Sequence, residues 1–258
     1  SEAKTVDLFR YQVIINAGRA GSAWSGGSAW EDDALAARLT EWAYGGGVFL
    51  GVNEPSAVPG YHRYFRMSQV LGVDLDTGDR VCHGAWPIEH RDAAEDRAAS
   101  LDAMAAVHGL AAERDRTGEG RLEAMQKLSK SMRLPEKQHM YLTEETTAVL
   151  AEENGILSAS VHPFGKGMGI WLAGFTYTPQ NARALEELLL LAAGEPQGRL
   201  PVTDNPATGC VYYPKSGTLA VCNHTLAPQK TTVRFGGQVV RTEEIGAGEC
   251  VFAAKASI

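Results

Sequence analysis

The chain has 258 residues, of which 44% are hydrophobic and 21% charged, enough for one large or two smaller domains with ordinary cores. Its net charge of −7 and its scattered Lys and Arg argue against a nucleic-acid partner, since phosphates require clustered basic side chains. The longest apolar run, residues 188–193, is far shorter than the roughly 20 residues of a membrane span. We therefore expect neither nucleic acid nor membrane as a partner.

Two apolar runs separated by one amphipathic segment open the chain. Residues 11–17 and 48–52 are continuous and rich in β-branched side chains, which predicts strands buried on both faces of a parallel sheet. Between them, residues 31–44 bring Leu35 and Trp42 to one face of a helix that ends at three glycines. The order predicts a right-handed strand–helix–strand unit whose two strands are adjacent at the centre of the sheet.

The following residues continue an α/β pattern. We expect an amphipathic helix around 64–71 and one or two exposed helices in the polar, Ala-rich segment 92–130. Residues 156–162 and 169–173 predict a hairpin at the end of the sheet. Residues 181–193 then predict a helix whose apolar side chains face the core.

The pattern changes after residue 196 to short, alternating segments rich in Val, Thr and Tyr. Such segments fall at 210–213, 218–223, 230–235 and 249–253, and this spacing is typical of a small antiparallel sandwich. We therefore expect an α/β domain over residues 1–196 and a β-sandwich over residues 204–258.

Cysteine and histidine give no metal-binding pattern. The four cysteines are far apart, at Cys82, Cys210, Cys222 and Cys250, and are expected to be reduced thiols that pack as small apolar side chains. The seven histidines show no paired spacing, so no metal site is predicted.

Two loops at the carboxyl ends of the first two strands contain the candidate functional residues. The Gly- and Ser-rich loop 18–27 lies where doubly wound sheets bind ligands, but it lacks both the dinucleotide-binding glycine spacing and a phosphate-binding lysine. It carries Trp24 and Ser25, and Trp24 is interpreted either as a contact or as a hydrophobic plug of its own loop.

The second loop, 53–56, has the position of a nucleophile elbow but presents Asn53 or Glu54 there, neither of which can act as an acyl-transfer nucleophile without a base. Glu54 is interpreted as an acid, a base or, preferably, a prop for the neighbouring loop. Since adjacent parallel strands bring their following loops together, the two loops should touch. The candidate substrate or interface residues are Asn53, Glu54, Ser56, Trp24, Ser25, Trp30 and Tyr61, and no catalytic residue is predicted.

Five segments resemble one family of sugar-processing enzymes. They are VIINAGRAGSAWSGGSAW, GGGVFLGVNEPSAV, RYFRMSQVLGVD, FGKGMGIWLAGFTYTPQNARALEELLLLAAG and VYYPKSGTLAVCNHTLAPQKTTV. Together they resemble the central α/β domain and the C-terminal β domain of the 1,3-β-galactosyl-N-acetylhexosamine (lacto-N-biose) phosphorylases. The resemblance spans most of residues 11–235 and is weakest over 92–150.

The resemblance implies a flavodoxin-like, class I glutamine-amidotransferase-like sheet followed by a small antiparallel β-sandwich. It implies a cytoplasmic homodimer that cleaves galactosyl-β-1,3-N-acetylhexosamine with inorganic phosphate, inverting the anomeric centre and giving galactose 1-phosphate. In that family the general acid and the sugar-binding residues lie on an N-terminal (β/α)8 barrel. The chain is thus expected to be a non-catalytic part, without a cofactor, that serves assembly and active-site closure. Strands normally precede the one at 11–17 in this fold, so truncation at the N-terminus is also expected.

Two other hypotheses remain. In the first, the chain is an independent carbohydrate-binding protein whose Trp24, Trp30 and Tyr61 stack on sugar rings. In the second, it is an amidotransferase-like protein without the catalytic Cys, which uses Glu54, His162 or both. The burial of the three aromatic side chains tests the first hypothesis, because an aromatic side chain that faces the core cannot stack on a glycan.

Overall fold

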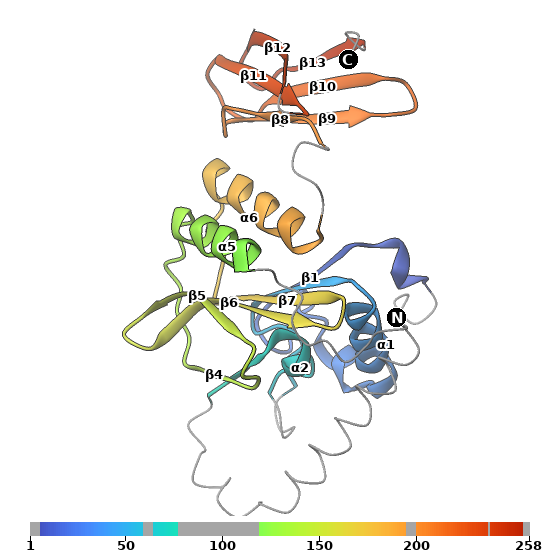
Figure 1. Ribbon diagram of the computed structural model, residues 1–258, viewed down its shortest axis with the longest axis vertical. Coiled ribbons are helices and arrows are strands. Elements are labelled where there is room, and N and C mark those ends of the chain that lie inside the picture. The colour runs from blue at the N-terminus through green and yellow to red at the C-terminus, as the bar shows by residue number, and fades with distance from the viewer. Residues whose placement is uncertain (1–5, 59–63, 77–118, 195–199, 237, 255–258) are drawn as a thin grey trace, which may run out of the picture. The chain divides into compact units, whose positions relative to one another are not determined.

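The computed structural model describes residues 6–58, 64–76, 119–194, 200–236 and 238–254 (Figure 1). Contacts divide the chain into two compact units, Ser1–Thr176 and Tyr177–Ile258. Tyr61, Cys82 and the Ala-rich segment up to residue 118 lie outside the described residues.

The described part of the first unit combines seven strands with five helical segments. Its strands are β1 (Val13–Gly18), β2 (Val48–Asn53), β3 (Val73–Leu75), β4 (Met140–Leu142), β5 (Ala148–Glu153), β6 (Ile156–Phe164) and β7 (Gly167–Leu172). Its helices are η2 (Leu8–Arg10), η3 (Gly27–Glu31), α1 (Asp33–Tyr44), α2 (Ser68–Leu71) and α5 (Glu119–Ser131).

Five of these strands form one mixed sheet in the order β1-β2-β7-β6-β5. β1, β2 and β7 are parallel, whereas β6 runs antiparallel to β7, and β5 antiparallel to β6. The predicted strand–helix–strand unit is confirmed, because β1 and β2 pair in parallel on either side of α1 in sequence. The fold is therefore α/β, and β3 and β4 form a separate two-stranded ribbon.

The expected positions of two elements in this sheet are wrong. Within the described residues β1 is an edge strand with one neighbour, so its outer side is open and Ile15 is 56% exposed. Only β2 has the buried character expected of both. The β6–β7 hairpin lies in the interior of the sheet rather than at its end, because β7 pairs with β2 and β5 extends the sheet beyond β6.

The helix α1 is confirmed and packs as predicted. The side chain of Asp32 accepts a hydrogen bond from the backbone N–H of Ala34, and Leu35, Leu39 and Trp42 are buried. A Cβ atom at Gly47 would lie 2.2 Å from the Trp42 ring, so only glycine allows the chain to turn into β2 at this place.

The helix expected at 64–71 is reduced to the single turn α2. The carboxylate of Asp74 accepts hydrogen bonds from the backbone N–H groups of Tyr64 and Phe65, at 3.0 and 2.8 Å. Phe65 also forms a β-bridge with Ala57. These contacts hold Tyr64 and Phe65 outside the helix, which begins only at Ser68.

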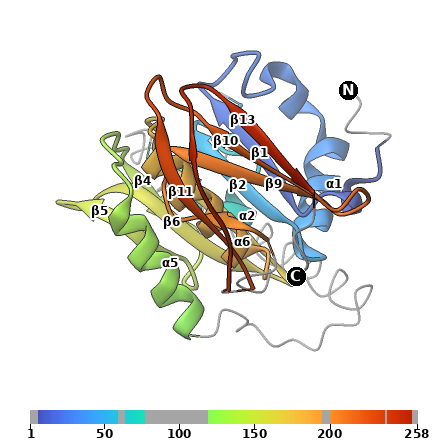
Figure 2. The ribbon, with the colours of Figure 1, turned by 90° about the horizontal axis from the view of Figure 1, so that it is seen from above.

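The second unit contains one helix and a β-sandwich. Its elements are α6 (Pro179–Ala192), β8 (Val202–Thr203), β9 (Thr208–Tyr213), β10 (Thr218–Asn223), β11 (Gln229–Phe235), β12 (Gln238–Ile245) and β13 (Cys250–Ala254). The strands form two three-stranded antiparallel sheets, β13-β10-β9 and β12-β11-β8. Figure 2 shows β13, β10 and β9 side by side. The predicted sandwich and four of its strands are confirmed, whereas β8 and β12 were not predicted.

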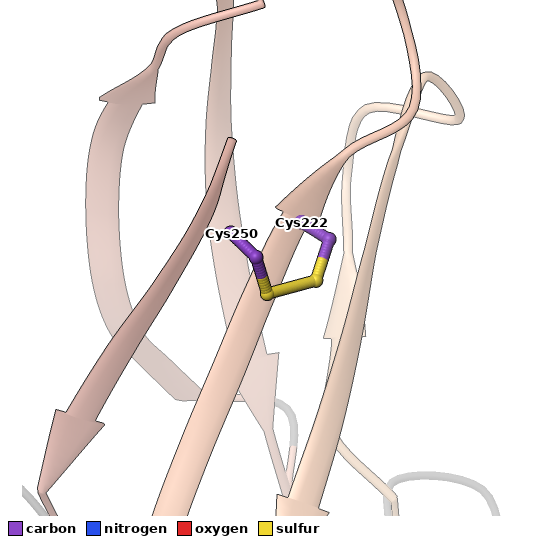
Figure 3. The surroundings of a disulfide bond; sticks show 2 residues. All are labelled: Cys222 and Cys250. Atoms are coloured by element: carbon purple, nitrogen blue, oxygen red, sulfur yellow. A yellow bond between two sulfur atoms is a disulfide. The ribbon is translucent and has the colours of Figure 1, made fainter. Parts of the chain in front are cut away.

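The sandwich contains a disulfide that contradicts the expectation of reduced thiols. Cys222 on β10 and Cys250 on β13 lie opposite each other in the ladder, with Cα atoms 4.0 Å apart, and are bonded (Figure 3). Sequence spacing hid the pair because the two residues are separated by 28 positions and meet only through strand pairing. Of the described cysteines, Cys210 is the free one, and burial raises its pKa to about 11.

Candidate functional site

The loops that follow β1 and β2 meet at the carboxyl edge of the sheet. The backbone N–H of Glu54 donates to the carbonyl of Gly18 at 3.1 Å, and one carboxylate oxygen of Glu54 accepts from the backbone N–H of Ala20 at 2.8 Å. The predicted contact between the two loops is therefore confirmed. Glu54 acts here as the expected prop, because its carboxylate satisfies a backbone donor of the neighbouring loop.

The side chain of Asn16 on β1 forms hydrogen bonds with both loops. Its amide nitrogen donates to the carbonyl of Ser25 at 3.0 Å, and its amide oxygen accepts from the backbone N–H of Ser56 at 2.7 Å. The sequence analysis missed this residue. The available signal was one amide in an otherwise apolar strand, because an amide that leaves water, even in part, needs polar partners.

The turn after β2 holds two non-glycine residues in the left-handed region. The φ angles are 69° for Asn53 and 53° for Ser56, values that L-residues adopt only at some cost. The carbonyl of Asn53 accepts from the Trp171 indole at 3.1 Å, and its side-chain oxygen accepts from Gln138 at 3.3 Å. The fully buried Ser56 hydroxyl accepts from the backbone N–H of Met67 at 3.0 Å. Surrounding contacts thus hold the turn in one shape.

The aromatic candidates separate by exposure. Trp24 is 86% exposed, so its interpretation as a hydrophobic plug is wrong. Trp30 is 4% exposed, and its indole donates to the carbonyl of Ser25, which is itself buried. Trp30 and Ser25 therefore cannot stack on or touch a ligand, whereas Trp24 can. Tyr61 lies outside the described residues.

Tyr64 adds a hydroxyl beside Glu54 that was not among the candidates. Burial, then the negative charge of Glu54 and a hydrogen bond to its carboxylate, raise the pKa of Tyr64 above its ordinary value. The neighbouring carboxylate and the burial thus both favour the protonated phenol.

The alternative catalytic residue, His162, is engaged elsewhere. It is buried, with one ring nitrogen 3.1 Å from the carbonyl of Val70 and the other 3.1 Å from the Thr146 hydroxyl. Neither partner belongs to the turn at 53–56. Within the ranges that the structure describes, no three His, Cys, Asp or Glu side chains gather as metal ligands, and no helix is long and apolar enough to cross a membrane.

The polar side chains at 53–56 and Asn16 are used to hold the two loops together. The elbow position holds Asn53, which is not a nucleophile, and Glu54 is used as a brace. The Trp24 indole faces solvent from a loop that buried hydrogen bonds hold in place.

Two family models match the chain in succession. The one described as "Lacto-N-biose phosphorylase central domain" matches residues 2–197, and the one described as "Lacto-N-biose phosphorylase C-terminal domain" matches residues 202–252.

Curated relatives agree with these matches. A D-galactosyl-β-1→4-L-rhamnose phosphorylase from Lachnoclostridium phytofermentans is 38% identical over 244 residues, covering 95% of this chain and 29% of the relative. A 1,3-β-galactosyl-N-acetylhexosamine phosphorylase from Bifidobacterium longum is 29% identical over 231 residues, covering 86% and 30%. Among solved structures, a β-galactosidase from Bacillus circulans sp. alkalophilus aligns with a TM-score of 0.49 and 16% identity, over 96% of this chain and 34% of that one. The chain thus spans about three tenths of the length of the curated relatives it matches.

Proposed function

Because the chain belongs to the lacto-N-biose phosphorylase family, we propose that it is the non-catalytic central and C-terminal part of an inverting glycoside phosphorylase. The observation that carries the proposal is the succession of the two family domains along the chain. The site geometry supports it, because the polar residues at the carboxyl edge of the sheet brace one another instead of presenting a nucleophile or an acid–base pair.

The proposed reaction of the whole protein is phosphorolysis of a β-galactoside. A phosphate oxygen attacks the anomeric carbon of galactose from the face opposite the leaving group, the glycosidic bond breaks, and the departing acceptor oxygen receives a proton. The products are α-galactose 1-phosphate and the free acceptor sugar. Galactosyl-β-1,3-N-acetylhexosamine is the proposed substrate. The names of the two curated relatives differ in acceptor and linkage, so galactosyl-β-1,4-L-rhamnose belongs in the same assay.

We further propose that the residues of this chain close and assemble the enzyme. The N-terminal (β/α)8 barrel is the proposed catalytic partner, and the whole protein is proposed to be a cytoplasmic homodimer. The surface that carries Trp24, Asn53 and Glu54 is the proposed contact with the barrel or a second subunit, because interface cores favour large aromatic side chains. Ser56 is buried and supports this surface from inside.

The finer architecture is also part of the proposal. The first domain is proposed to be flavodoxin-like, in the class I glutamine-amidotransferase manner, over residues 1–196. Three parallel strands with α1 as a crossover support this assignment. The sandwich is proposed to occupy residues 204–258.

Two measurements on the native gene product test the proposal. Intact mass spectrometry should give a polypeptide about three times as long as this chain, the inverse of the 29–30% coverage of the relatives. In that full-length protein, Glu54→Ala should leave the fold intact while raising the KM for sugar or phosphate or weakening dimerisation. Unchanged kinetics together with an unchanged oligomeric mass would assign Asn53, Glu54 and Ser56 to the turn alone.

A further inference from the structure

Asn154 and Gly155 form the turn of the hairpin between β5 and β6. The loop has two residues, because Glu153 and Ile156 on either side of it are paired in the ladder. The φ angles are 54° for Asn154 and 76° for Gly155, which fit the type I′ turn that Asn-Gly favours. Both residues are exposed. The dipeptide therefore lies in solvent at the tip of the hairpin.

The reactive groups of this dipeptide are not engaged. In the ranges that the structure describes, neither the side-chain amide of Asn154 nor the backbone N–H of Gly155 has a hydrogen-bond partner. Apart from its chain neighbours, a Cβ atom at Gly155 would find no heavy atom within 4 Å. A backbone nitrogen can attack the preceding amide when the nitrogen is accessible, the amide can rotate and no side chain shields the nitrogen. Asn154 and Gly155 meet all three conditions.

The other asparagines of the chain each lack at least one of these conditions. The backbone N–H that follows Asn53, Asn181 and Asn223 is held in a hydrogen bond to a carbonyl. Asn205 precedes a proline, which has no N–H. Both ends of the Asn16 amide are held, one by the Ser25 carbonyl and the other by the Ser56 N–H. The fold thus protects these five and leaves Asn154 open to reaction.

We propose that Asn154 and Gly155 form a self-modification site at which Asn154 deamidates through a cyclic imide. The Gly155 nitrogen loses its proton to solvent and forms a bond to Cγ of Asn154. The bond from Cγ to Nδ2 then breaks, and the leaving nitrogen takes up protons from solvent and departs as ammonia. Water opens the ring at either carbonyl, which gives aspartate or isoaspartate. The net reaction consumes water, releases ammonia and needs no oxidant, reductant or cofactor.

The two products differ in their effect on the hairpin. Aspartate keeps the turn, because Asp-Gly also fits type I′, and adds a negative charge beside the exposed Glu152 and Glu153. Isoaspartate inserts a methylene group into the main chain of a loop whose length sets the register of the two strands. Within the described residues β5 is an edge strand whose only neighbour is β6. Isoaspartate at this position should therefore loosen β5, and hydrogen exchange in β5 should become faster.

The test incubates the 258-residue chain in mildly alkaline buffer, once folded and once in urea. Mass spectrometry of the asparagine-containing peptides locates the reaction, since deamidation adds the mass of water and removes that of ammonia. Urea opens every asparagine and gives the time in which Asn154 reacts without the fold. Over that time we expect the folded chain to be modified at Asn154 and at no other asparagine. Methylation by a protein-isoaspartate methyltransferase with S-adenosylmethionine identifies the isoaspartate.

Two variants give the controls. Asn154→Gly should stay unmodified, because Gly-Gly also fits the turn but has no amide to react. Gly155→Ala should slow the reaction by about tenfold or more, since its Cβ shields the nitrogen. Measuring this variant in urea as well keeps the comparison valid if the positive φ strains its turn.

Three results would overturn the proposal. In the first, the folded chain stays unmodified over the time that modifies Asn154 in urea, so that the turn protects the site. In the second, another asparagine of the folded chain reacts before Asn154. In the third, Gly155→Ala reacts as fast as the native chain both folded and in urea. None of these outcomes depends on whether the full-length protein has phosphorylase activity.

Discussion

The two units are stabilised in different ways. The first buries large side chains that pack on one another, among them Trp42, Trp171 and Phe49, each at most 1% exposed. The sandwich core has three fully buried apolar side chains, Val221, Val233 and Ile245, with half-buried neighbours. A small sandwich of this kind gains less from burial and needs other links. In the second unit, a disulfide and side-chain hydrogen bonds supplement this smaller apolar core.

Those links are visible in the second unit. The amide of Asn223 donates to the carbonyls of Ala227, Ile245 and Gly246, at 2.8, 3.2 and 2.9 Å. Arg183 of α6 donates to the hydroxyl of Thr203 at 2.6 Å and to the carbonyls of Thr203 and Thr208 at 3.0 and 3.2 Å. The side chains of Asn223 and Arg183 thus link loops and strands through hydrogen bonds, in addition to the apolar contacts of the small core.

The largest effect is expected in the core of the first unit. Trp171→Ala should lower the free energy of unfolding of that unit by about 3–5 kcal/mol, since it opens a cavity and removes the donor to the Asn53 carbonyl. Urea unfolding monitored by fluorescence measures the change. The exposed Trp24→Ala is the control and should stay within about 0.5 kcal/mol of the native value. Equal losses in both variants would contradict the assignment of this core.

The second largest effect is expected at the disulfide. Its 28-residue separation predicts a stabilisation of the sandwich by about 3 kcal/mol, mainly through restriction of the unfolded chain. Reduction, or the double variant Cys222→Ser and Cys250→Ser, should lower the melting temperature of the second unit and leave the first unchanged. Reductant should not shift the double variant any further. If Cys222 and Cys250 of the native chain both react with an alkylating reagent before reduction, the disulfide is absent. The sandwich would then have no covalent stabilisation.

A smaller loss is expected at Asn223. Asn223→Ala removes the donor to three carbonyls, of which those of Ile245 and Gly246 close the β12–β13 connection. The expected loss is about 1–3 kcal/mol, the usual cost of leaving buried polar groups unpaired. Hydrogen exchange should report it as faster opening in β10 and β13. Exchange that accelerates only in the first unit would refute the placement of this network.

The smallest effect concerns pH. The backbone N–H of Thr232 lowers the pKa of Asp204 below its ordinary 3.8, with further help from the Thr231 and Thr232 side chains. A lowered carboxyl pKa stabilises the fold above the unfolded value, and that stabilisation is lost as pH falls through the folded value. The sandwich should therefore lose slightly more stability below pH 4 than its Asp204→Asn variant. Parallel stability curves for the two proteins between pH 5 and pH 3 would contradict this.

The sequence pattern predicted which segments form helices and strands better than it predicted which strands lie next to each other. The runs that became β2, α1 and β10 could be read from the sequence, because each carries a complete periodic signal. The edge position of β1 could not, since continuous apolar character also fits an edge whose outer side is open. The short α2 and the Cys222–Cys250 bond depend on Asp74 and on strand pairing, which are contacts between residues distant in sequence.

The sequence predicted where the candidate site lies, but not the role of each residue in it. The contact between the two loops followed from strand adjacency, and Glu54 proved to be a brace. The two candidate tryptophans looked alike in sequence, yet Trp30 packs in the core and donates to the Ser25 carbonyl, while Trp24 stays in solvent. Asn16 was missed because its role depends on two partners that come from different loops.

The most direct test of the central claim is a phosphorolysis assay of the purified 258-residue chain beside the full-length gene product. Both receive inorganic phosphate with galactosyl-β-1,3-N-acetylhexosamine or with galactosyl-β-1,4-L-rhamnose, and galactose 1-phosphate is measured against a blank without enzyme. We expect product from the full-length protein with at least one disaccharide and none above the blank from the 258-residue chain. Galactose 1-phosphate formed by the 258-residue chain alone would contradict it.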